Sequence, residues 1–466
     1  MKRSLPLRHY TPWLLALSIG PALAAETESV VGEPSSLPSP EAAAATPSPF
    51  ELGHKLTVQG GYGPENSQPG NDDKGFYGLR YEPSLSWRSS EPQWPKWQAF
   101  GRAWLNYNSS SQASTGLQDE NSQQIEYFSA ELREFYVRRN LLGDDPRFSL
   151  SLGRQRYADH FGIWWDDSLE SLRLNFDDTF ARGFVAVAQQ LHSYNSDIKA
   201  LDDSERDIAY AMGEYALRWS GENWAGVRLL LEQDHSGRDA DDPSDFDGAR
   251  AGLFFHGDAL SVSPLFSDYH LELVALDGDV ELASGDEQDR SGWAVLGEIG
   301  KRFHALPWTP RLALHGGITD KPDASDDGFY LNAIQSDRVA NPDTYSSGLV
   351  SSFIGVDLRN LAYYGIALET QPQPRHHLDL RFSDLYLRDA DGAVPISLGE
   401  PAEQNGSRSL GQTLDLNYYW EMFPLALQDK HVQVNALFTA SYFRAGDAIG
   451  NLDNDSQLSF GVVLRY

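Results

Sequence analysis

Long segments in which apolar and polar residues alternate constrain this chain more than any other feature. In GFYGLRYEPSLSWR (75–88), Tyr77 and Leu79 have one parity, and Arg80 and Glu82 have the other. Adjacent side chains of a strand point to opposite faces, so such alternation predicts a strand between two different environments. The same pattern occurs in segments 97–108, 207–219, 225–234, 290–300, 376–384, 411–420, 431–443 and 457–466.

The length of these segments narrows the fold class. We count roughly sixteen to eighteen of them, each about ten residues long, which is the length of a tilted transmembrane β-strand. Globular strands average about five or six residues. Tight connections alternate with long acidic ones: the former include 142–147 and 304–308, and the latter 108–124, 233–248, 277–292 and 320–350. This layout predicts an all-β fold, a transmembrane antiparallel β-barrel of about 18 strands with long extracellular loops and short periplasmic turns.

The two parities then have different surroundings. Backbone groups in lipid must be paired internally, so the strands must close into a barrel whose apolar parity faces lipid. Aromatic residues near strand ends would form interfacial girdles, as with Trp87, Trp97, Tyr107, Trp219 and Trp420. The polar parity would face a water-filled lumen. The alternative is a soluble secreted β protein, although a propeller would show a repeat of about 40 to 50 residues, which we do not find.

The N-terminal region predicts export to the cell envelope. Basic residues precede a short apolar run that ends in Ala22-Leu23-Ala24, which is the pattern of a secretory signal peptide over 1–24. Residues 25–52 are rich in Ala, Pro and Ser and predict a disordered leader. Residues 53–466 are then the barrel, in the outer membrane of a Gram-negative cell.

Composition argues against several functions. The formal net charge of −30 argues against nucleic-acid binding, and the absence of cysteine excludes thiolate chemistry. Neither G-x-S-x-G nor H-E-x-x-H occurs, and the adjacent His376 and His377 would point to opposite faces of a strand. We therefore predict no enzyme, no catalytic residues, no cofactor and no metal site. Ca²⁺ at the acidic loop 239–248 is left open, with solvated acid as the simpler interpretation.

Several motifs resemble those of the alginate export family of outer-membrane porins. They are SAELREFYV (129–137), RFSLSLGRQRYADHFGIWWDDSLESLRLNF (147–176), GFVAVAQQLHSYNSD (183–197), LRNLAYYG (358–365) and YFRAGDAIG (442–450). The resemblance implies an eighteen-stranded barrel that exports alginate, an anionic polyuronate, by passive diffusion. It also implies a basic pore constriction edged by carboxylates, formed by Lys55, Arg133, Arg154, Arg156 and Arg338 with Asp166 and Asp197.

The chain departs from the family pattern at several basic positions. Glu82 stands where the family has an arginine, and segment 345–358 lacks the arginine expected before LRNL. Leu437 and Thr439 stand where the alginate exporter has two lumenal arginines. The solute therefore stays open: an alginate-like uronate, another small organic anion or saccharide, or a ligand of a receptor whose lumen is plugged.

Lumenal arginines have two interpretations of their own. They would favour anions through charge and hydrogen bonds to carboxylate, or they would pair with lumenal carboxylates and hold the shape of the barrel. In GRQR, simple alternation puts Arg154 and Arg156 on the lipid-facing parity of Leu152. A bulge at Gly153 would shift that parity, and a strand end above the membrane would also remove the cost.

The segment QLSFGVVLRY (457–466) predicts the last strand of the barrel. It must pair with the first strand near residues 55–62, because an open edge in lipid would leave backbone groups unpaired. The resemblance implies that the barrel assembly machinery recognises this strand and its terminal aromatic residue, Tyr466. Outer-membrane lipid and lipopolysaccharide are the other expected partners, and the protein is expected to be a monomer.

Overall fold

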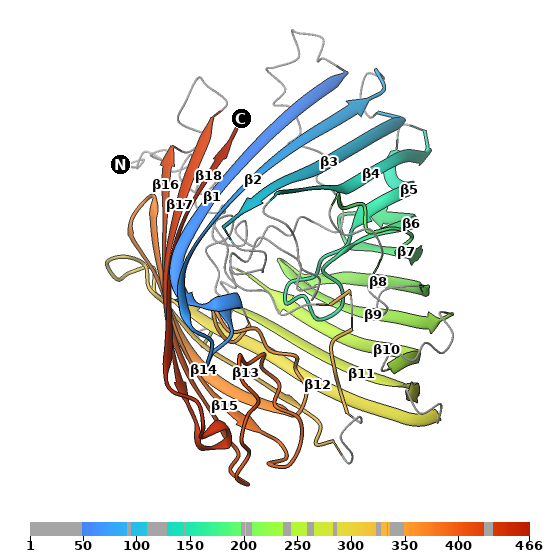
Figure 1. Ribbon diagram of the computed structural model, residues 1–466. Coiled ribbons are helices and arrows are strands. Elements are labelled where there is room, and N and C mark those ends of the chain that lie inside the picture. The colour runs from blue at the N-terminus through green and yellow to red at the C-terminus, as the bar shows by residue number, and fades with distance from the viewer. Residues whose placement is uncertain are drawn as a thin grey trace, which may run out of the picture.

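Eighteen antiparallel strands form one closed sheet in the computed structural model of the protein (Figure 1). Each strand pairs with its neighbours in sequence, and the last pairs with the first. The predicted antiparallel barrel of about 18 strands is confirmed. The structure describes residues 49–90, 95–109, 128–143, 145–196, 201, 207–235, 244–258, 265–282, 287–322, 328–332, 334–335, 349–423 and 432–466.

The strands are long, from nine residues in β7 and β13 to 16 in β2 and β12. Among the described residues, no helix is long and apolar enough to cross a membrane. The strands are β1 (Phe50–Pro64), β2 (Asp73–Arg88), β3 (Trp97–Asn108), β4 (Phe128–Leu142), β5 (Asp145–Arg156), β6 (Ser168–Asp177), β7 (Ala181–Gln189), β8 (Ile208–Ser220), β9 (Asn223–Asp234), β10 (Ser244–Gly257), β11 (Asp268–Leu282), β12 (Glu287–Arg302), β13 (Arg311–Thr319), β14 (Leu361–Gln373), β15 (His376–Leu387), β16 (Ser409–Phe423), β17 (Gln433–Ala445) and β18 (Asp455–Arg465), with 3₁₀ turns η3 (Glu65–Ser67) and η5 (Asp447–Ile449).

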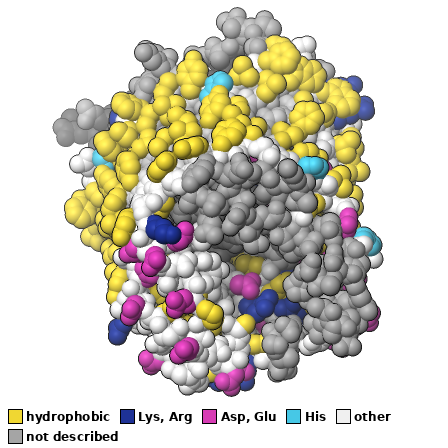
Figure 2. Space-filling model, in the orientation of Figure 1, with side chains coloured by type: hydrophobic (Ala, Val, Ile, Leu, Met, Phe, Trp, Pro, Cys, Tyr) yellow, Lys and Arg dark blue, Asp and Glu magenta, His cyan; other side chains and the backbone are white. Residues whose placement is uncertain are grey.

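The two faces of the sheet follow the predicted parity. In β2, Tyr77 and Leu79 are 54% and 39% exposed, whereas Arg80 and Glu82 are 7% and 5% exposed. Figure 2 shows hydrophobic side chains gathered over the upper part of the outer surface, and acidic ones gathered at the lower rim. The polar parity therefore points into the barrel.

β1 and β18 close the barrel, and β18 pairs with the predicted segment of β1. Lys55 lies opposite Arg465, and the pairing runs on to Tyr62 opposite Leu458. At the C-terminus, Tyr466 N donates to His54 O (2.8 Å), and His54 N donates to Tyr466 O (2.9 Å). The segment predicted as the closing strand therefore pairs with the first strand to its last residue.

One predicted loop is wrong. The acidic segment 277–292 is mostly strand, because β11 continues to Leu282 and β12 begins at Glu287. Val280 and Arg290 keep the buried, inward parity of their strands. The acidic residues of this segment had suggested a loop, but they fit a strand whose outer face lies in water.

Some predictions fall outside the described residues. These are the signal peptide, almost all of the leader, residues 239–243 of the acidic loop considered for Ca²⁺, Asp197 and Arg338. β1 begins at Phe50, within the segment assigned to the leader.

Candidate functional site

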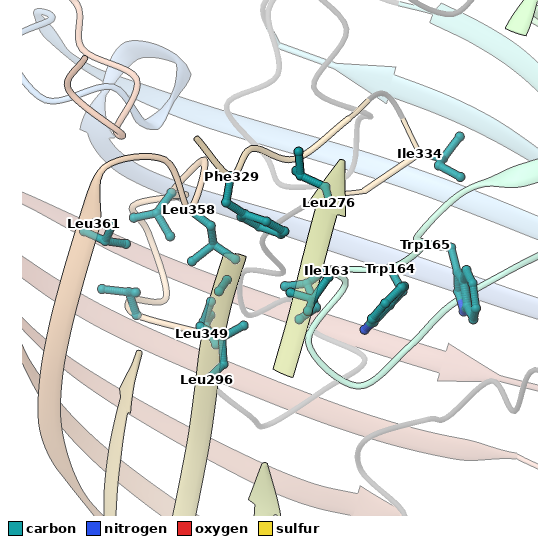
Figure 3. Packing of buried hydrophobic residues seen from close by; sticks show 14 of the residues in the cluster. Ile163, Trp164, Trp165, Leu276, Leu296, Phe329, Ile334, Leu349, Leu358 and Leu361 are labelled. Carbon is teal, nitrogen blue, oxygen red and sulfur yellow. The ribbon is translucent and has the colours of Figure 1, made fainter. Parts of the chain in front are cut away.

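Two connections between strands fold into the barrel and pack against each other. One is segment 157–167 after β5, and the other consists of residues 328–332, 334–335 and 349–360 between β13 and β14. Their buried apolar side chains form one cluster with wall residues such as Leu276 and Leu296 (Figure 3). The interior is therefore narrowed by the chain's own side chains at this level.

A single carboxylate shapes the first of these segments. Asp159 accepts hydrogen bonds from the backbone N–H of Trp164 (2.9 Å) and Trp165 (3.1 Å), and from those of Phe161 and Gly162. These bonds satisfy backbone donors that would otherwise be buried without partners. Both tryptophans are consequently fixed inside the barrel, where they are almost completely buried.

Charged wall residues hold the second segment. The guanidinium groups of Arg250 and Arg290 lie 4.5 and 3.8 Å from the ring centroid of Tyr330, and Arg250 Nη1 donates to Tyr330 O (2.6 Å). Burial raises the pKa of Tyr330 to about 12. The phenol is therefore neutral at physiological pH, and its ring face attracts both cations.

Lys55 and Arg133 lie in a polar cluster on the inward faces of β1–β4. Lys55 Nζ is 3.0 Å from Glu82 Oε1, and Arg133 pairs with Glu131 (2.6 Å) and Asp167 (3.3 Å). The Trp104 ring joins the two pairs: its Nε1 donates to Glu82 (3.0 Å), and the Arg133 guanidinium stacks 4.2 Å from its centroid.

A β-bulge explains the position of Arg133. The register between β3 and β4 shifts there: Arg102 lies opposite Glu134, and Ala103 lies opposite Leu132. Arg133 is the extra residue of β4, so that it and its neighbour Glu134 are both buried. Simple alternation would have sent one of them to the outer face.

The GRQR motif places its two arginines differently from each other. Arg156 Nη2 pairs with Asp166 Oδ1 (2.6 Å), at the point where the chain leaves β5 for the interior. Arg154 pairs with Glu170 (3.1 Å) and lies 4.9 Å from the Tyr194 ring. The ladders on both sides of Gly153 stay in register, so the bulge considered there is absent and the strand-end interpretation is favoured.

Where β5 stops pairing with β4, segment 190–196 pairs with β4 instead. β4 pairs with β5 only as far as Phe135. Beyond it, Leu132 N donates to Tyr194 O (3.1 Å), and Ser196 N donates to Ala130 O (2.8 Å). This short segment completes the wall of the barrel and covers Arg154.

The structure thus brings together four of the predicted site residues. Trp104 connects the Arg133–Asp167 pair to Glu82, the partner of Lys55, and Asp166, the partner of Arg156, directly precedes Asp167 in the chain. Arg154 lies apart from them with Glu170. Glu131 is one of the lumenal carboxylates expected to pair with the arginines, whereas sequence reasoning missed Trp104 and Asp167 as partners, although the adjacent Asp166 and Asp167 in WWDD were a signal for two contacts.

The departures from the family pattern have visible consequences. Glu82 binds Lys55 where an arginine was expected, and Leu437 and Thr439 occupy buried inward positions of β17. Inward cations of β9, β10, β13 and β15 also have carboxylate partners. Ion pairs join Arg228 to Glu214 and Glu272, Arg250 to Glu232, Arg311 to Asp268, Glu298 and Glu369, and Arg381 to Glu298.

Metal ligands do not gather in the described part of the chain, where no group of three or more His, Asp or Glu side chains could hold an ion.

Figure 2 shows basic and acidic side chains together in a recess of the visible face. The arrangement is suited to exchanging internal carboxylates for those of a solute.

Comparisons with known proteins agree with this geometry. Residues 80–462 match the model of a family described as alginate export. The alginate production protein AlgE of Pseudomonas syringae pv. tomato is 26% identical over 391 residues, covering 74% of this chain and 76% of that protein.

Solved structures share the fold at low sequence identity. Pseudomonas aeruginosa OccK9 (OpdG) has a TM-score of 0.57 and 11% identity, covering 90% of this chain and 97% of that one. Pseudomonas aeruginosa OpdK, solved with vanillate, has a TM-score of 0.54 and 11% identity, covering 89% and 98%. Acinetobacter baumannii OccAB1 has a TM-score of 0.54 and 12% identity, covering 89% and 96%.

Proposed function

This chain belongs to the alginate export family, and from that premise we propose that it lets an anionic polysaccharide or uronate cross the outer membrane by passive diffusion. Its family and fold are those of an outer-membrane transport porin. The solute of this proposal is alginate-like, the pore is lined by Arg and Lys, and the functional unit is a monomer.

The observation that carries the proposal is that Trp104 joins Arg133 to Glu82, the partner of Lys55, while the Arg156–Asp166 pair involves the residue just before Asp167. Arginine presents a planar pair of donors that matches a carboxylate. The Trp104 ring supports these donors, because the guanidinium groups of Arg80 and Arg133 lie 3.5 and 4.2 Å from its centroid. Arg133 contacts that ring and two carboxylates at once.

Internal ion pairs give a mechanism for passage. Glu131 and Asp167 hold Arg133 when no solute is present, and a sugar carboxylate would replace one of them. Because one ion pair is exchanged for another, the solute would meet no deep energy well and could leave again. Arg154, Asp197 and Arg338 complete the proposed pore-lining set.

The test is single-channel recording with uronate oligomers as blockers. We expect wild-type channels to prefer anions, and Arg133→Ala and Arg156→Ala to weaken block by about tenfold each, the effect of losing one charged hydrogen bond. Arg218→Ala is the control, because Arg218 pairs with Glu222 across a turn. Cation preference, or block that neither variant changes, would contradict the proposal.

The apolar cluster between the two lumenal segments favours a second candidate, a receptor with a plugged lumen. Trp164, Phe329 and Leu358 are nearly or completely buried inside the barrel. Silent bilayers together with ligand binding that depends on the loops would establish this second function. A conductance selective for another small organic anion or saccharide would keep the porin and change its solute.

A further inference from the structure

Arg173 differs from most buried arginines of the described barrel wall. Its side chain is 3% exposed, and among the described residues its Nε and Nη2 atoms find no hydrogen-bond acceptor. It stacks instead on two rings, 4.2 Å from the centroid of Phe184 and 5.0 Å from that of Tyr157. A buried guanidinium with open donors is costly unless an anion or water satisfies it.

A second arginine lies at the same level of the wall. Arg138 of β4 is opposite Ser151 of β5, and Ser151 is opposite Arg173 of β6. Neighbouring strands are about 4.8 Å apart, so the two Cα atoms are about 10 Å apart, with a short side chain between them. Arg138 Nε donates to Ser149 Oγ (2.8 Å), and its salt-bridge partners are absent among the described residues.

The surrounding groups complete a site for an oxyanion. Ser149 and Ser151 present hydroxyl groups, and Asn175 Nδ2 lies 3.4 Å from Ser151 Oγ. Of the nearby carboxylates, Glu134 pairs with Arg102 and Glu214 with Arg228, whereas Asp177 lies at the exposed end of β6 and interacts with Arg138 through its charge.

We propose that Arg138 and Arg173, on either side of Ser151, bind a carboxylate group of the transported solute. The proposal rests on the proposed function, because it supplies a second binding position for an anionic saccharide. This position lies between Arg133 and the turn that joins β4 to β5. Two guanidinium groups spaced across a serine would hold one carboxylate with hydrogen bonds from both sides. Tyr157 and Phe184 are buried, so their rings would hold the Arg173 guanidinium in position for the carboxylate.

The variants remove the cations or fill the site. Arg138→Gln and Arg173→Gln each remove one charge, and we expect about tenfold weaker block by a uronate trisaccharide. Ser151→Asp places a carboxylate between the two arginines and should abolish binding of the solute carboxylate there. Arg147→Gln is the matched control, because Arg147 is exposed and pairs with Asp145 at the neighbouring turn.

Thermal unfolding in detergent provides a readout that does not need conduction. A ligand that binds only the folded barrel raises its melting temperature, so the trisaccharide should stabilise wild type and Arg147→Gln but stabilise Ser151→Asp less. A neutral trisaccharide measures ring contacts alone, and inorganic phosphate measures binding of a free oxyanion. Heat-modifiable migration on gels shows which variants are folded.

The outcomes separate this site from the proposed function. Equal stabilisation of wild type and folded Ser151→Asp by the trisaccharide overturns the site, even if the channel conducts anions. Stabilisation that Ser151→Asp loses, in a barrel that conducts no anions, supports the site and refutes diffusion. Stabilisation by phosphate without the trisaccharide overturns the assignment to a sugar carboxylate.

Discussion

Gly153 is a position of the wall where no side chain fits. Its φ is +129°, and a Cβ there would lie 2.3 Å from Phe135 O and 2.9 Å from Tyr136 Cα. Both contacts are with backbone, which cannot move without breaking the ladder between β4 and β5. The glycine of GRQR thus allows close approach of two strands just before β5 leaves the wall.

Gly153→Ala should therefore lower the stability of the barrel by roughly 1–3 kcal/mol, the cost of a strained backbone position. Gly101→Ala is the control, because its Cβ would meet Phe135 Cδ2 at 3.6 Å and Glu134 O at 3.9 Å, both ordinary van der Waals distances, and its φ is not positive. Urea unfolding followed by tryptophan fluorescence measures both. Equal midpoints for the two variants would show that the strand relaxes around the methyl group.

Arg133 shows what alternation can and cannot predict at the level of one residue. The sequence placed Arg133 in the lumen by its motif, and strict alternation then requires Glu134 to face lipid. The structure buries both through the bulge in β4. Two adjacent charged residues in a transmembrane strand were a signal for such a bulge, because neither tolerates lipid.

The two lumenal segments are the elements that decide how open the barrel is. Phe329 is completely buried in the cluster that joins them. Replacing a buried phenylalanine by alanine costs about 3–5 kcal/mol, and here that cost falls on the packing of a loop rather than on the strand ladder. The barrel itself should remain folded.

Phe329→Ala should accordingly increase single-channel conductance and its noise. Phe180→Ala is the matched control, because Phe180 is 68% exposed at a turn. The same conductance in both variants would mean that the apolar cluster does not limit the flow of ions.

Tyr330 gives the second segment a defined pH response. Its pKa is raised by burial to about 12, whereas a free phenol titrates near 10. The docked segment therefore retains the proton more tightly than the undocked one, and docking is weakened as the pH rises from about 10 to about 12. Conductance of wild type should rise over that window, and that of Tyr330→Phe should not; identical profiles would refute this role.

Elements differed in how far the sequence predicted them. Strand parity depends on the immediate surroundings of each residue, so alternation predicted β2, β8 and β18 well. The lumenal segments depend on contacts between residues far apart in sequence, such as the hydrogen bond from Asp166 N to Ile334 O (2.6 Å). The apolar run FGIWW (161–165) in a connection was a sign of burial, and it was attributed only to the family motif.

At the scale of the whole molecule, the ends of the barrel sheet meet in one seam. Tyr466 exchanges two backbone hydrogen bonds with His54, and the two rings lie 6.2 Å apart. The pairing of the last strand with the first could be predicted because a barrel in lipid tolerates no open edge. The solute could not be predicted, because selectivity depends on which carboxylates neutralise each lumenal cation.

Removing Tyr466 should lower the yield of assembled barrel, since His54 loses both bonds at the seam. We propose that the barrel assembly machinery also reads this residue, and that lipopolysaccharide surrounds the outer rim. Tyr466→Phe keeps the ring and the backbone and should assemble like wild type. Outer-membrane fractions compared on semi-native gels measure this; equal yields of the truncated and full-length chains would contradict both roles.

Segment 190–196 has a practical consequence for engineering this barrel. Connections between strands are commonly chosen as sites for inserting epitopes or binding peptides, because most of them are dispensable for folding. Here Tyr194 and Ser196 supply hydrogen bonds that β4 cannot obtain from another strand. An insertion between them would open the wall, so a display tag is better placed in the exposed turn around Gly406, where a side chain would meet no neighbouring atom.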